Sequence, residues 1–164
     1  MKKAQIQAQV FVYVLAMLVI ALVLLYGYRS INTMKERANQ VDLLAFKNDM
    51  TKSIEKVSND YGTVRVPTFN IPKEYKEVCF IDIDNSPEES IESEHPLVYE
   101  AWNDETANVF LITDLAEEFF MVGDTESSII RIDDPNYLCV SVKNSKLKIR
   151  LEGVGGQAQL SLPE

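Results

Sequence analysis

The chain has 164 residues and a formal net charge of −9, and 46% of its residues are hydrophobic. This length suffices for one domain with a core beside a membrane segment, and it is too short for two such domains. All 25 acidic residues follow Tyr28, whereas two of the 16 basic residues precede it. The negative charge of the later part repels nucleic acid and anionic lipid headgroups, so neither is expected as a partner.

The chain opens with a signal-like segment, residues 1–9, followed by an uncharged apolar segment, residues 10–28. A helix of about 19 residues approaches the ~30 Å thickness of the bilayer hydrocarbon. The sequence therefore predicts a single transmembrane helix over 10–28. Positive charges flank the segment almost equally, so they leave the topology undecided. A Lys-Lys pair precedes the apolar run, and no small-residue cleavage site follows it. This order favours a cytoplasmic N-terminus and an extracytoplasmic C-terminal domain.

Residues 29–62 are predicted to continue this helix as an amphipathic one. The stretch holds no proline, and apolar residues recur at spacings of three and four. Gly62 is suited to end the helix, which we expect to stop near residue 61. The first part of the apolar stripe, 31–41, packs either on another helix or on the chain's own sheet. The second part, 43–61, is expected to pack on the chain's own sheet.

From residue 63 to 164 the pattern changes to short β-type runs, and we expect an antiparallel β-sheet domain packed on the distal half of the helix, an α+β fold. Asn144-Ser145 and Gly153 to Gly156 are predicted turns. Residues 83–96 are expected to form an acidic loop, and 115–120 either a strand or a short helix. The candidate strands are 64–69, 77–82, 108–112, 128–132, 137–143, 146–151 and 157–162.

The two cysteines, Cys79 and Cys139, each lie in a β-type run. In a domain that faces outward they could form a disulfide, which would close a loop of about 60 residues and contribute roughly 4 kcal/mol. The alternative is a pair of small buried side chains that never meet.

The N-terminus resembles that of archaeal type IV pilin-like proteins, which carry a class III signal peptide. The resemblance rests on the basic pair Lys2-Lys3, the small Ala4 and the following Gln5, and it implies a cut by a prepilin-type peptidase between Ala4 and Gln5. The family has Glu at the fifth mature position, where this chain has Gln9. A glutamine keeps only a hydrogen bond where a carboxylate would pair with an ammonium group.

The resemblance further implies that the apolar helices of several subunits pack side by side while the sheet domains coat the outside. The partners would be copies of this chain or other pilin-like subunits, in a filament or as a minor subunit. The residues that would pack in this way are Gln9, Val10, Val14, Met17 and Ala21.

No pattern in the sequence indicates an enzyme, a metal site or a cofactor. The single histidine, His95, is expected to be a solvated residue of the acidic loop, without a nucleophile pattern around it. The run from Asp82 to Glu89 begins like a calcium loop, but Pro87 stands where such a loop needs glycine, so a solvated acidic loop is favoured. Trp102 is expected beside a short helix, as a core or lid residue.

The sequence thus predicts a pilin-like, single-span, surface-displayed structural subunit that assembles through its N-terminal helix. The alternative is a membrane-tethered extracytoplasmic binding module that does not polymerise and that holds a partner with its sheet and the 83–96 loop. A small surface enzyme would require a convergent polar cluster that the sequence does not reveal.

Overall fold

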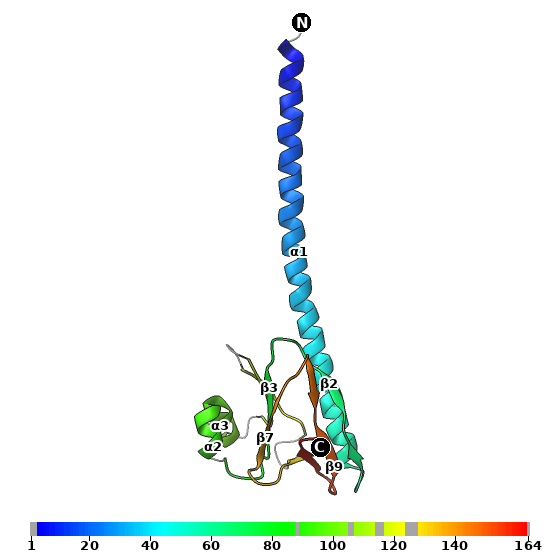
Figure 1. Ribbon diagram of the computed structural model, residues 1–164, viewed down its shortest axis with the longest axis vertical. Coiled ribbons are helices and arrows are strands. Elements are labelled where there is room, and N and C mark those ends of the chain that lie inside the picture. Colours follow the sequence, from blue (N-terminus) through cyan, green and yellow to red (C-terminus); the bar gives the residue numbers. More distant parts are fainter. Residues whose placement is uncertain (1–2, 88, 105–106, 114–116, 124–127, 164) are drawn as a thin grey trace. The chain divides into compact units, whose positions relative to one another are not determined.

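The computed structural model of the protein describes residues 3–87, 89–104, 107–113, 117–123 and 128–163. The fold is α+β, with a long N-terminal helix and several sheets that are mostly antiparallel, as predicted in outline (Figure 1). The helices and strands are α1 (Lys3–Ser58), β1 (Val64–Arg65), β2 (Thr68–Asn70), β3 (Glu77–Ile81), α2 (Glu89–Glu94), α3 (Pro96–Asn103), β4 (Val109–Ile112), β5 (Glu117–Phe120), β6 (Ile130–Arg131), β7 (Tyr137–Ser141), β8 (Lys146–Lys148), β9 (Arg150–Gly153) and β10 (Ala158–Ser161).

Helix α1 comprises 56 residues and ends at Ser58, three residues before the predicted end. The Asp60 amide already donates to the Val57 carbonyl in a tighter turn. Gly62 adopts a φ of +76°, and its amide donates to the carbonyl of Gly153 in β9. The helix ends early because the Gly62 amide donates to strand β9 and not to a carbonyl of the helix. By its internal contacts the chain divides into two units, residues 1–41 and 42–164.

The described strands form three sheets. Their strand orders are β1-β9-β10-β6, β2-β8 and β5-β4-β3-β7. The expectation of a purely antiparallel sheet is wrong at one place, because β6 pairs with β10 in parallel, with Ala158 opposite Ile130. The predicted turn between β9 and β10 is present, since the two strands pair antiparallel with Leu160 opposite Leu151.

Two of the predicted strands are each divided in two. The predicted strand 64–69 becomes β1 and β2, because Pro67 lies between them and cannot donate a ladder hydrogen bond. The predicted strand 146–151 is interrupted at Ile149, so that β8 pairs with β2 while β9 pairs with β1 and β10. The Asn144-Ser145 turn is present, with φ of +53° and +58° and a bridge between Lys143 and Lys146.

Strand β3 alternates between two separate cores, as the two-residue period of a strand requires. Val78 and Phe80 belong to the larger core, whereas Cys79 and Ile81 belong to the smaller one. The larger core also contains four buried side chains of α1 and residues of β8, β9 and β10. The four side chains of α1 are Phe46, Met50, Ile54 and Val57.

A polar cluster lies at the edge of the larger core. Lys47 Nζ of α1 lies 2.8 Å from Glu118 Oε1 of β5, and the Tyr75 hydroxyl donates to Glu118 Oε2 at 3.1 Å. Burial and the neighbouring carboxylate of Glu118 raise the pKa of the Tyr75 hydroxyl. Lys47 also lies 5.3 Å from the centre of the Phe120 ring, so one ammonium group contacts both a carboxylate and an aromatic face.

The smaller core is covered by α2 and α3, which corrects the expectation of a plain acidic loop over 83–96. Ile91 and Val98 supply buried side chains from the two helices. Trp102 is 1% exposed and its indole donates to the carbonyl of Asn85, so it is a core residue. The 115–120 segment is strand β5 from residue 117 onward, and residues 114–116 lie outside the described part.

Candidate functional site

The residues of the predicted processing signal lie at the start of α1. Lys3, Ala4 and Gln5 are within its first turns, and Lys2 lies outside the described residues. Gln9 is exposed, and its amide donates to the Tyr13 hydroxyl one turn later at 3.4 Å. The Gln9 side chain therefore has a neutral hydrogen-bond partner on its own helix.

The apolar segment of α1 carries exposed side chains along its whole length. Every large hydrophobic side chain from Val10 to Tyr28 is 51–81% exposed. Val10, Val14, Met17 and Ala21 follow one another at spacings of four, three and four, so they share one helix face. By length and composition α1 could cross a membrane, and it is the one such helix among the described residues.

The two parts of the amphipathic stripe differ in exposure. In the first part Ile31, Met34 and Val41 are 55%, 69% and 63% exposed. In the second part Phe46 and Met50 are at most 2% exposed. The first part is therefore exposed, whereas the second belongs to the larger core.

Cys79 and Cys139 are joined by a disulfide that links β3 to β7. The two residues stand directly opposite each other in the antiparallel register, with Cα atoms 4.0 Å apart. Cys79 is fully buried and Cys139 is partly exposed. The disulfide therefore links two neighbouring strands at the smaller core and joins residues that are 60 positions apart in the sequence.

His95 lies beside this disulfide, which corrects the expectation of a solvated loop residue. It connects α2 to α3, and its side chain is only 15% exposed. A ring nitrogen of His95 and the two cysteine sulfurs all lie within 4.8 Å of one another. His95 Nε2 lies 3.3 Å from Glu77 Oε2, two residues before Cys79 on the same face of β3.

Sequence reasoning missed this cluster because its members are far apart along the chain. Cys79, His95 and Cys139 match no short metal-ligand spacing. The one available signal is that Glu77 and Cys79 are two residues apart in a predicted strand, so they share a face. Nothing in the sequence places His95 over that face, because its position depends on α2, which the sequence analysis did not predict.

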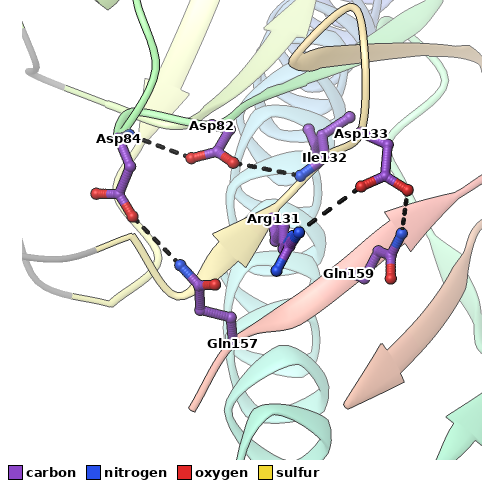
Figure 2. A network of polar contacts seen from close by, with 7 residues as sticks. All are labelled: Asp82, Asp84, Arg131, Ile132, Asp133, Gln157 and Gln159. Atoms are coloured by element: carbon purple, nitrogen blue, oxygen red, sulfur yellow. Dashed lines mark hydrogen bonds and ion pairs between the residues drawn. The ribbon is translucent and has the colours of Figure 1, made fainter. Parts of the chain in front are cut away.

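The acidic run after β3 forms a hydrogen-bonded network (Figure 2). Asp82 is 3% exposed and accepts from the amides of Asp84 and Ile132 at 3.1 and 3.4 Å. Asp84 in turn accepts from the Ser128 amide and from the Gln157 side chain. The carboxylates of Asp82 and Asp84 thus join the end of β3 to the segments around β6 and β10, which corrects the expectation of a solvated acidic loop at these two residues.

Burial is the main influence on Asp82. It raises the pKa of that carboxyl group, and the amide hydrogen bonds of Asp84 and Ile132 act in the opposite direction. Both carboxylate oxygens of Asp82 thus accept hydrogen bonds from backbone amides, so this buried group has a structural role. Asp133 adds a second link, because it accepts from Gln159 of β10 and lies 4.0 Å from Arg131 (Figure 2).

Comparison with models of protein families, with curated proteins and with solved structures finds no match to this chain.

Proposed function

We propose that this protein is a pilin-like, single-span, surface-displayed structural subunit that is anchored and assembled through its N-terminal helix. The observation that carries the proposal is the exposure of every large hydrophobic side chain from Val10 to Tyr28. A continuous apolar surface of this size is unstable in water, so lipid or other apolar helices must cover it. A helix suits this environment because its backbone hydrogen bonds are satisfied internally.

The exposed part of the stripe beyond this segment supports assembly as well as anchoring. Ile31, Met34 and Val41 lie on α1 after the uncharged segment, where a bilayer no longer covers side chains. Apolar side chains recurring at helical spacing are typical of a surface that packs against another helix. The partner we propose is the same segment of a second pilin-like subunit.

The Cys79–Cys139 disulfide supports an extracytoplasmic position for the C-terminal domain. Disulfides persist in oxidising compartments and are rare where thiols are kept reduced. With one span, the N-terminus would then lie in the cytoplasm, where a prepilin-type peptidase would cut between Ala4 and Gln5. Gln9 in place of Glu weakens the proposed pairing with a neighbouring amine, so a minor subunit fits better than the main filament subunit.

The first test is the mass of the N-terminal peptide of the protein isolated from its native membranes. A start at Gln5 is expected, and Ala4→Leu should abolish the cut because the position before it requires a small residue. Ala8→Leu, four residues further on, is the matched control and should be cut normally. A start at Met1 in the unaltered protein would contradict processing and favour a tethered binding module.

The second test asks whether the helices of two copies lie side by side. Val14→Cys and Met17→Cys should form disulfide-linked dimers in membranes under mild oxidation. Glu92→Cys, on an exposed turn of α2, controls for random collision. Equal cross-linking at all three positions, or none at Val14→Cys and Met17→Cys, would contradict assembly through the helix.

A further inference from the structure

We propose that Cys79, Cys139 and His95 form a Zn²⁺ site that is blocked while the two cysteines are joined in a disulfide. Reduction of the disulfide would free the two thiolates, which would bind Zn²⁺ together with the imidazole of His95. Thiolate and imidazole are the donors that zinc prefers in proteins. The inference is independent of the proposed structural function, since it concerns only the domain formed by residues 42–164.

The backbone already places the three donors close together. The register sets Cys79 opposite Cys139, and the connection between α2 and α3 carries His95 over the same face of β3. The three donor atoms lie within 4.8 Å of one another. Tetrahedral zinc with Zn–S near 2.3 Å and Zn–N near 2.0 Å needs donor separations of about 3.5–3.8 Å. Once the S–S bond is broken, rotations about side-chain bonds supply movements of this size.

Glu77 provides the second argument for a metal site. Its carboxylate lies 3.3 Å from His95 Nε2, the arrangement in which a carboxylate holds one ring nitrogen and leaves the other free to bind metal. A disulfide that only joins β3 to β7 needs no imidazole and no carboxylate beside it. The negative charges of Glu77 and two thiolates would also favour a divalent cation over an empty reduced site.

Opening requires a two-electron reductant, which we take to be a dithiol. A thiolate of the dithiol attacks Sγ of Cys139, the partly exposed residue of the pair, and Cys79 leaves as a thiolate. The second thiol of the reductant then releases Cys139, so the dithiol is oxidised to its own disulfide. Zn²⁺ binds the two thiolates and His95, and any proton still held by a thiol is released to solvent. The fourth position is left to water, as in sites with three protein ligands.

The test is a Co²⁺ titration of the full chain in detergent micelles, because tetrahedral Co²⁺–thiolate gives charge-transfer and visible bands. The protein is reduced with a phosphine, desalted without oxygen and titrated next to the untreated form. We expect one Co²⁺ per chain in the reduced protein, displacement by Zn²⁺, and no bands in the oxidised protein. His95→Ala should weaken binding by at least about tenfold, and Glu77→Gln by about 10–100-fold.

Ser93→Ala, at the exposed end of α2, is the matched control and should bind as the unaltered chain does. Circular dichroism of each reduced sample follows the fold. If reduction unfolds the domain, Zn²⁺ should restore the spectrum of the unaltered chain and fail to restore that of His95→Ala. Absence of thiolate bands in the reduced protein, or equal binding with and without His95, would overturn the proposal.

Discussion

At the scale of single residues, Glu118 makes a pH-dependent contribution to stability. The hydrogen bond from Lys47 holds the pKa of this carboxyl group below its usual value of 4.5, although partial burial acts in the opposite direction. A group whose pKa is lower in the folded state stabilises the fold fully above its unfolded pKa. That contribution is lost as the pH falls through the folded pKa.

Glu118→Gln should therefore lower the free energy of unfolding at pH 7 by less than about 1 kcal/mol, because the pair with Lys47 is partly exposed. The difference from the unaltered protein should approach zero as the pH falls toward about 2. Urea unfolding at a series of pH values measures it. Glu92→Gln, on the exposed surface of α2, should show no such pH dependence. A difference that grows in acid would contradict the assignment.

Gly153 is a residue at which a single methyl group matters. A Cβ there would collide with the carbonyl oxygens of Val57 and Asp60, at the point where α1 ends against β9. Gly153→Ala should destabilise the domain by about 2–3 kcal/mol, because backbone on both sides resists displacement. Gly156→Ala, in the same turn with open space around it, should cost only about 1–2 kcal/mol for its positive φ of +86°. Thermal unfolding compares them, and equal losses would rule out a steric cause.

At the scale of elements, α1 contains two methionines in opposite environments. Met50 is 0% exposed in the larger core, whereas Met34 is 69% exposed. Met50→Ala should cost about 2–5 kcal/mol, because it leaves a cavity, whereas Met34→Ala should leave the unfolding of the domain unchanged. Urea unfolding of both variants measures this contrast. A large loss for Met34→Ala would mean that the first part of the stripe is covered within the chain.

The strands show which features of a sheet a periodic sequence pattern can predict. Alternation located most of the runs, and the break at Pro67 follows from the chemistry of that residue alone. The break at Ile149 does not follow from that residue, because it arises where β8 pairs with β2 while β9 pairs with β1 and β10. The parallel pairing of β6 with β10 is also invisible in the sequence, since direction is decided by the path of the chain between them.

At the scale of the whole molecule, the described residues of both hydrophobic cores lie after residue 41. The four side chains of α1 in the larger core begin at Phe46, and residues 42–164 form a unit with its own internal contacts. A fragment of residues 42–164 should therefore fold and stay in solution, because it retains the core and lacks the apolar segment. Circular dichroism and gel filtration should give a folded monomer with nearly the unfolding midpoint of the full chain. Aggregation of the fragment would contradict this division.

The sequence by itself determined the long helix, the uncharged segment within it and the α+β class, because these depend on composition and period along continuous stretches. For the two cysteines it left a disulfide and separate burial open, and the register of β3 with β7 decides between them. It placed His95 in solvent, whereas α2 and α3 bring this residue beside Glu77 and the disulfide. Only the tertiary structure could decide such points, because contacts between residues 16 to 60 positions apart depend on how strands and helices pack.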